Sequence, residues 1–154
     1  MHKRNILIAI ISLVFIIGIG IIVSKNNVDS TIKREIVKIT SDDMAISTIF
    51  QSERGFGNDC FDIYDFHFDS GECPSMFKDK DVNFEKSYYN TYDSMIEQVV
   101  DDENLKKKII NKESQILSSR NLMYYCYEIK KGSRWYMFIY DSNTNEGLMF
   151  HFEI

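Results

Sequence analysis

A long uninterrupted apolar segment near the N-terminus separates the chain into two parts of different character. Residues Ile6–Val23 form a run of 18 residues without a charge. As a helix, this run would rise about 27 Å at roughly 1.5 Å per residue, close to the ~30 Å hydrocarbon core of a bilayer. It has no polar face of the kind that a soluble helix shows. We therefore predict a transmembrane helix, followed by a polar linker to residue 29.

The flanks of this run predict its orientation. Lys3 and Arg4 precede it and Lys25 follows it, a bias that favours a cytoplasmic N-terminus. A cleaved signal peptide usually has a shorter apolar core and a site of small residues, which is missing here. A lipoprotein signal needs a Cys directly after the run, whereas the first Cys is at residue 60. We expect an uncleaved signal anchor in the cell membrane, with residues 30–154 outside.

The pattern after the linker changes to alternation typical of strands. Alternating apolar positions predict one strand over residues 45–53, and the aromatic-rich residues 60–68 predict a second. Between them, residues 55–59 are Gly, Phe, Gly, Asn and Asp, most of which favour turns. The two strands would form a hairpin. In the first strand, Ile46, Thr48 and Phe50 would face one way.

Spacings of three and four residues then predict helices. Tyr88, Tyr92, Met95 or Ile96, and Val99 give one amphipathic helix over about residues 84–100, with Asp81 or Asn83 as its N-cap. The acids at residues 101–103 offer a second helix start. Leu105 and Ile109 would line that second, shorter helix.

The C-terminal third is predicted to be a meander of three strands over residues 123–129, 135–140 and 148–154. In the last strand, Leu148, Phe150, Phe152 and Ile154 alternate with the more polar face of Met149, His151 and Glu153. The fold class is therefore α+β: an N-terminal transmembrane helix, then a small antiparallel sheet packed with one or two helices. We expect two parts, residues 1–29 as anchor and linker and residues 30–154 as an extracytoplasmic domain.

Charge narrows the choice of partners. Residues 1–29 contribute +2 to the total of −5, so residues 30–154 carry −7. This acidic balance argues against nucleic acid and would attract cations or a basic peptide.

Three cysteines in an oxidising compartment suggest one disulfide and one free thiol. Cys60 would pair with Cys73 or, across neighbouring strands, with Cys126, and a fully reduced state is a third alternative. There is no CxxC motif for thiol exchange and no zinc-module spacing.

One candidate set of metal ligands lies in and next to the second predicted strand. Asp65, His67 and Asp69 share one face of a strand, but Asp65 and Asp69 would lie about 13 Å apart at roughly 3.3 Å per residue. We expect a solvated face there, and no metal or cofactor. Cys126 and His67 would meet only if their strands paired, and no G-x-S-x-G motif is present. We expect a protein that is not an enzyme.

Aromatic residues make up 14% of the chain, and Tyr and Trp are enriched at interfaces. They suggest a binding face built from the hairpin and the C-terminal strands. Its members would be Asp62, Tyr64, Asp65, His67, Tyr125 and Trp135.

Two stretches resemble uncharacterised small exported proteins of low-GC Gram-positive bacteria. The stretches are residues 52–59 with the strand that follows, and residues 135–150. The resemblance covers about a quarter of the chain and implies a membrane-anchored or lipid-anchored protein without an established activity. Asn58-Asp59 departs from the Asp-Gly usual in those turns, and no functional residues carry over. The sequence thus favours a tethered, non-enzymatic module that binds a protein or cationic peptide, as an immunity protein does. The alternative is an accessory subunit of a membrane complex.

Overall fold

A computed structural model describes residues 34, 44–54, 59–88, 91–92, 94–129 and 133–154. The chain separates into two compact units, Met1–Ile39 and Thr40–Ile154. In the first unit only Arg34 is described, and it is helical and exposed. The predicted membrane segment Ile6–Val23 lies outside the described residues. No helix among those that are described has the length and apolar character needed to cross a membrane.

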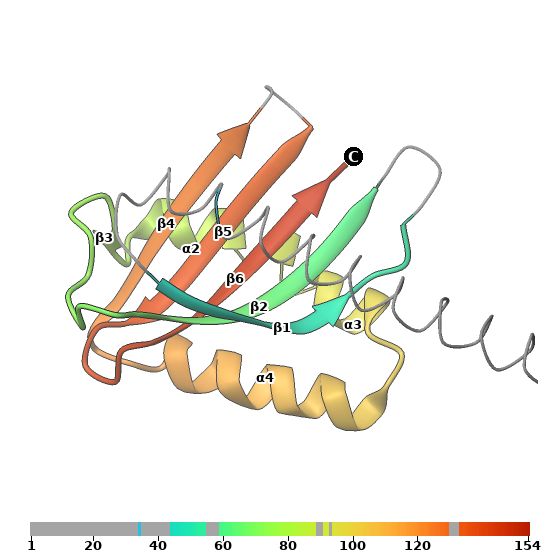
Figure 1. Cartoon of the computed structure of the whole chain (residues 1–154), viewed down its shortest axis with the longest axis horizontal. Coiled ribbons are helices and arrows are strands. Elements are labelled where there is room, and N and C mark those ends of the chain that lie inside the picture. The colour runs from blue at the N-terminus through green and yellow to red at the C-terminus, as the bar shows by residue number, and fades with distance from the viewer. Residues whose placement is uncertain (1–33, 35–43, 55–58, 89–90, 93, 130–132) are drawn as a thin grey trace, which may run out of the picture. The chain divides into compact units, whose positions relative to one another are not determined.

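The second unit is an α+β structure built on one antiparallel sheet of six strands, which confirms the predicted class for this part of the chain. The strands are β1 (Met44–Gln51), β2 (Cys60–Phe68), β3 (Lys78–Asp79), β4 (Leu122–Ile129), β5 (Arg134–Asp141) and β6 (Glu146–Glu153). Their order across the sheet is β1-β2-β6-β5-β4-β3, which puts the last strand in its middle (Figure 1).

The predicted hairpin and meander are both confirmed. β1 pairs with β2, and β4, β5 and β6 pair in succession, all antiparallel. The sequence did not predict β3, which is only two residues long and pairs Lys78 with Tyr124 and Asp79 with Met123.

The prediction that Ile46, Thr48 and Phe50 share one face is wrong. Thr48 pairs with Tyr64, but Phe50 pairs with Ile63, because the register shifts between Thr48 and Phe50. A bulge of this kind inserts one extra residue, so side chains beyond it switch to the other face of the sheet.

The helix predicted over residues 84–100 is described as two shorter helices. The described residues there form two helices, α2 (Val82–Tyr88) and α3 (Ser94–Val99), with Thr91 and Tyr92 in a wider, π-type turn between them. Asp81 caps α2, since its Oδ1 accepts from the Phe84 N–H at 2.8 Å. The apolar face predicted from the spacing is nevertheless present, since Tyr88, Tyr92 and Ile96 are all buried.

The second helix is longer than predicted. α4 runs over Glu103–Leu117 and is capped by Asp102, whose side chain accepts from the N–H groups of Asn104 and Leu105. Its buried residues are Ile109, Glu113 and Ile116. These three positions have helical spacing, but the charged Glu113 interrupts the apolar pattern from which the full length of α4 could be predicted. Its carboxylate is buried because the Tyr88 hydroxyl donates a hydrogen bond to it.

The two faces of the sheet are both buried but are built differently. One face, here the helix face, packs Phe61, Ile63, Met137, Ile139, Leu148 and Phe150 against α2, α3 and α4. The opposite face carries the alternate residues of the same strands, among them Tyr64, Phe66, Tyr136, Phe138 and Tyr140. Phe77 packs over its aromatic end, with ring centroids 5.5 Å from Phe68 and 5.9 Å from Phe138.

Candidate functional site

Three chemically reactive side chains meet on the opposite face, at the end where β2 begins and β6 ends. Asp62 pairs directly with His151 across the two strands, and Cys60 lies two residues from Asp62 on the same face. Opposite and diagonal neighbours on one sheet face lie within reach of each other's side chains. The Cys60 Sγ is 3.7 Å and the Asp62 Oδ2 is 3.4 Å from the same atom, the His151 Nδ1. All three side chains are buried.

Asp62 is the charged centre of this cluster. Its carboxylate is completely buried and accepts two hydrogen bonds from the Arg54 guanidinium, at 3.2 and 2.8 Å. The Tyr64 hydroxyl donates a third, at 3.3 Å. Burial alone would raise the pKa of Asp62, but the hydrogen bonds from His151 and Arg54 outweigh burial and lower it. Asp62 is therefore ionised at neutral pH.

The other side of the His151 ring makes no hydrogen bond to the part of the chain that the structure describes. The ring stacks on Tyr136 at a centroid distance of 4.7 Å. Among the described residues its Nε2 is buried and has no hydrogen-bond partner. The nearest carboxylate oxygen on that side is the Glu153 Oε2, 3.8 Å away. Glu153 itself is fixed by two hydrogen bonds from Arg134, at 3.0 and 2.8 Å.

This cluster is not arranged as a nucleophilic triad. In a triad, the nucleophile and the acid contact different ring nitrogens of the histidine, whereas here both face Nδ1. Burial and the charge of Asp62 also raise the pKa of the Cys60 thiol to about 11, so it is protonated at neutral pH. The residue types and their convergence instead suit a metal ligand set, since thiolate, carboxylate and imidazole are the groups that bind zinc.

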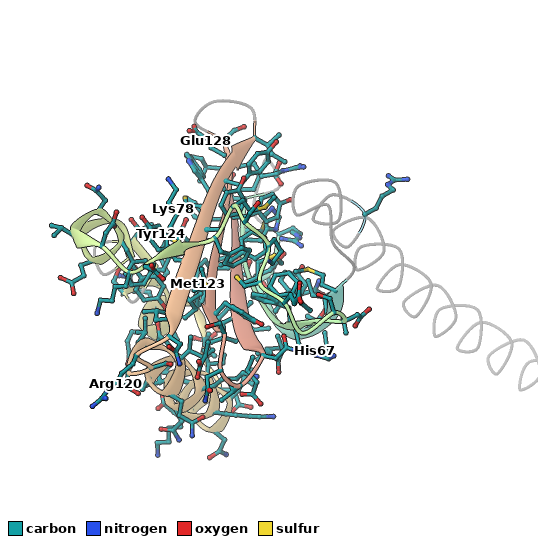
Figure 2. All side chains as sticks on the ribbon, turned by 90° about the vertical axis from the view of Figure 1, so that its left-hand side faces the viewer. His67, Lys78, Arg120, Met123, Tyr124 and Glu128 are labelled. Atoms are coloured by element: carbon teal, nitrogen blue, oxygen red, sulfur yellow. The ribbon has the colours of Figure 1, made fainter. Side chains whose placement is uncertain are left out.

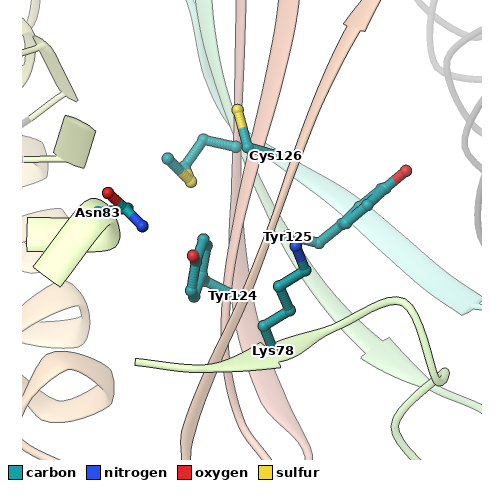
Figure 3. Close-up of a pocket in the computed structure, with 6 residues that line it drawn as sticks. Lys78, Asn83, Tyr124, Tyr125 and Cys126 are labelled. Atoms are coloured by element: carbon teal, nitrogen blue, oxygen red, sulfur yellow. The ribbon is translucent and has the colours of Figure 1, made fainter. Parts of the chain in front are cut away.

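A second feature is a shallow groove on the helix face beside β4. A hollow of about 250 Å³ is lined by Lys78, Asn83, Tyr124, Tyr125, Cys126 and Met137. Figure 3 shows Tyr124 and Tyr125 on opposite sides of β4, with Asn83 facing the Tyr124 side. A neighbouring hollow of about 300 Å³ is lined by Thr91, Tyr92, Cys126, Trp135, Met137 and Phe152. Cys126 and Met137 border both, so the two hollows are adjacent.

The structure does not bring the six predicted binding residues onto one surface. Asp62 and Tyr64 are 0% and 1% exposed and belong to the buried cluster on the opposite face. Asp65 is half-buried, and its carboxylate pairs with Lys112 of α4 at 2.6 Å. His67 is exposed near the far end of β2 (Figure 2).

The remaining two predicted residues, Tyr125 and Trp135, are half-buried on opposite faces of the sheet. Trp135 stacks on Phe152 with centroids 5.4 Å apart. Only these two border the groove.

Of the alternatives for the cysteines, the structure has the fully reduced one: all three are free thiols, and neither Cys60–Cys73 nor Cys60–Cys126 is formed. β6 and β5 separate β2 from β4, so Cys126 faces neither Cys60 nor His67 across neighbouring strands. Asp65, His67 and Asp69 do not converge on a point. Within the described part of the chain, the group whose ligand atoms all lie within 4.8 Å of one another is Cys60, Asp62 and His151.

Sequence reasoning missed His151, Arg54 and Glu153 as members of the buried cluster. The alternation of the last strand did place His151 and Glu153 on one more polar face. No local pattern indicates that this face meets Cys60 and Asp62, because β2 and β6 are separated by 77 residues, from 69 to 145. Comparisons with protein-family models, curated proteins and solved structures found no match to this chain.

Proposed function

We propose that this protein is a membrane-tethered extracytoplasmic module that binds an extended, basic segment of a protein or peptide partner and does not act as an enzyme. The observation that carries this proposal is the outer edge of β4. β4 has eight residues, yet among the described residues only Lys78 and Asp79 of β3 pair with that edge (Figure 2). An incompletely paired edge offers backbone groups to an added strand.

The backbone geometry identifies the groups that would pair. The Leu122 carbonyl accepts from the Lys80 N–H at 3.3 Å and so points outward. Backbone groups alternate in direction along a strand, so those of Tyr124 and Cys126 also point outward. Tyr124 already faces Lys78. Cys126 is thus the first residue beyond β3 whose N–H and C=O are directed to the free edge.

The groove supplies specificity beside this edge. The two hollows next to Cys126 would take alternate side chains of an added strand, because such side chains project to one face every second residue. One of them is bordered by the half-buried pair Trp135 and Phe152, and aromatic residues of this kind anchor interfaces. The charge of −7 on residues 30–154 favours a basic partner. An immunity protein that intercepts a cationic toxin is the specific form that we favour.

The test is a crosslinking pull-down from cells that carry the full-length protein. We expect Cys126→Pro to lose the partner, because proline removes the outward N–H without removing a hydrogen bond to β5. Cys126→Ser keeps the N–H and is the matched control. Equal recovery of the partner by both variants would show that strand addition at β4 is not the mode of binding.

Exchange of residues 1–29 for another membrane anchor tests the tether separately. A soluble partner that is retained after the exchange supports the binding module. Partners that are membrane proteins and are lost with the native anchor would overturn it in favour of an accessory subunit of a membrane complex.

A further inference from the structure

We infer that Cys60, Asp62 and His151 form a binding site for a zinc-like divalent cation, with Glu153 as its supporting carboxylate. This inference is independent of peptide binding, since the site lies on the opposite face of the sheet from the groove beside β4. It rests on the contacts around the two nitrogens of one buried histidine.

The first argument is that two possible metal-ligand atoms share one nitrogen, His151 Nδ1. One ring nitrogen offers either one N–H or one lone pair. Yet the Cys60 Sγ and the Asp62 Oδ2 both lie near it, at 3.7 and 3.4 Å. A cation held by all three atoms uses the lone pair of Nδ1 together with a thiolate and a carboxylate oxygen.

The second argument is the spacing of these atoms. Zinc bonds of about 2.0–2.3 Å in a tetrahedral arrangement place ligand atoms roughly 3.3–3.6 Å apart. The distances from His151 Nδ1 to Cys60 Sγ and to Asp62 Oδ2, 3.7 and 3.4 Å, lie just above and within this range, and all three ligand atoms lie within 4.8 Å of one another. Small side-chain shifts would therefore complete the site. Three protein ligands leave a fourth position for water or another molecule.

The third argument comes from His151 Nε2, which is buried without a hydrogen-bond partner among the described residues. When Nδ1 binds a cation, the neutral ring carries its proton on Nε2. Histidine ligands commonly donate this proton to a carboxylate that fixes the ring. The Glu153 Oε2 lies 3.8 Å away, and Arg134 holds that carboxylate in place. If the distance between His151 Nε2 and Glu153 Oε2 shortened by less than about 1 Å, Nε2 would have a hydrogen-bond partner.

The charges of the site are compatible with a cation. On binding, the Cys60 thiol loses its proton to water, and the thiolate and the Asp62 carboxylate together neutralise the two charges of the ion. The Arg54 guanidinium then keeps its contact with the Asp62 carboxylate. The roughly four lone-pair sites of that carboxylate serve two bonds from Arg54, one from the Tyr64 hydroxyl and the cation, with the Tyr64 bond moving from Oδ2 to Oδ1. The Arg54 side chain is 38% exposed, so water screens its charge.

The experiment is a Co²⁺ titration of freshly reduced full-length protein in detergent, followed by its absorption spectrum. We expect a thiolate-to-cobalt charge-transfer band that saturates at one ion per chain and disappears when Zn²⁺ is added. Cys60→Ala should lose the band, whereas Cys73→Ala and Cys126→Ala should keep it. The chain thus provides two matched cysteine controls, neither of which belongs to the cluster.

Glu153→Gln keeps all three ligands and tests whether Glu153 supports His151. Its readout is the affinity for Co²⁺, since the band itself should still form. We expect the cobalt affinity to fall about 10- to 100-fold. This variant also remains informative if Cys60→Ala fails to fold. Absence of the band from the wild-type protein at saturating Co²⁺, or its loss in the Cys73 or Cys126 variant, overturns the proposal.

Discussion

The helix face and the opposite face of the sheet are both buried, but they meet different physical requirements. The helix face joins apolar side chains from two layers, so it depends mainly on how well volumes fit. The opposite face also encloses a carboxylate, a thiol and an imidazole, so it depends in addition on whether every polar atom has a partner. Their contrast shows that similar burial does not mean similar sensitivity to a given substitution.

The largest effects should come from removing a ring from either face. Phe150 on the helix face and Phe138 on the opposite face are both 0% exposed. We expect Phe150→Ala and Phe138→Ala each to lower the free energy of unfolding by about 3–5 kcal/mol. Urea denaturation of the two variants measures the difference. A much smaller loss for Phe138→Ala would show that the opposite face is the less tightly packed of the two.

Removal of the buried charge should have the next largest effect. We expect Asp62→Asn to cost about 1.5–3 kcal/mol at neutral pH, the range for hydrogen bonds to charged groups. Asp65→Asn, on the same strand, is the matched control. The Asp65 side chain is 38% exposed and its carboxylate pairs with Lys112, so we expect this variant to lose only about 0–1 kcal/mol of stability. Equal losses for the two variants would contradict the central role of Asp62.

We also predict that these two variants differ in how their stability depends on pH. The pKa of Asp62 is lowered in the folded protein, so its stabilising effect is fully present above its unfolded pKa of about 3.9. This contribution is lost as the pH falls from there through the folded pKa. We expect wild type and Asp65→Asn to lose stability over this acidic range. Asp62→Asn should lack that part of the loss when thermal unfolding is followed against pH.

A substitution at a close contact on the opposite face should have an intermediate to small effect on stability. The Phe66 ring lies against Gly147 of the neighbouring strand, so a Cβ there would overlap the ring. We expect Gly147→Ala to cost about 1–3 kcal/mol. The double variant Phe66→Leu with Gly147→Ala should lose less than the sum of the single variants in a denaturation cycle. Additive losses would mean that the strain does not come from this ring.

The prediction with the smallest effect concerns how fast two cysteine thiols react with an alkylating reagent, and it involves no change in stability. Cys126 is exposed and Cys60 is buried. The thiol pKa of both is raised, that of Cys60 to about 11, so the contrast between them rests on exposure. We expect an alkylating reagent at neutral pH to label Cys126 rapidly and Cys60 only when the protein unfolds. Mass spectrometry of partly labelled protein measures both rates. Rapid labelling of Cys60 in the native protein would show that the cluster opens to solvent.

The elements predicted best from the sequence were those defined by local patterns. Alternation and turn residues indicated the hairpin and the meander, and Asp81 was one of two residues predicted as the helix cap. The elements missed were those in which tertiary contacts override the pattern. Glu113 occupies a core position of α4 because Tyr88 satisfies it, and the bulge in β1 moves Phe50 to the other face.

The buried cluster could not be predicted for a related reason. Each strand showed its own alternation, but the pairing of β2 with β6 sets which residues become neighbours. A shift of that pairing by two residues would keep every face unchanged and would separate Asp62 from His151. The chemistry of the site therefore depends on long-range register, which a single sequence does not display. The solvated face predicted for Asp65, His67 and Asp69 holds for His67 and Asp69, which are exposed, but not for Asp65, which is half-buried and pairs with Lys112 of α4.

The central position of β6 has a consequence for how the sheet comes into being. The β1–β2 and β4–β5 pairs precede β6 in the chain, and β6 joins them, since it pairs with β2 on one side and with β5 on the other. Until β6 inserts between them, the folding chain has two separate ribbons whose inner edges are both open to mispairing. The sheet can therefore close only when residues 146–153 take their place in it.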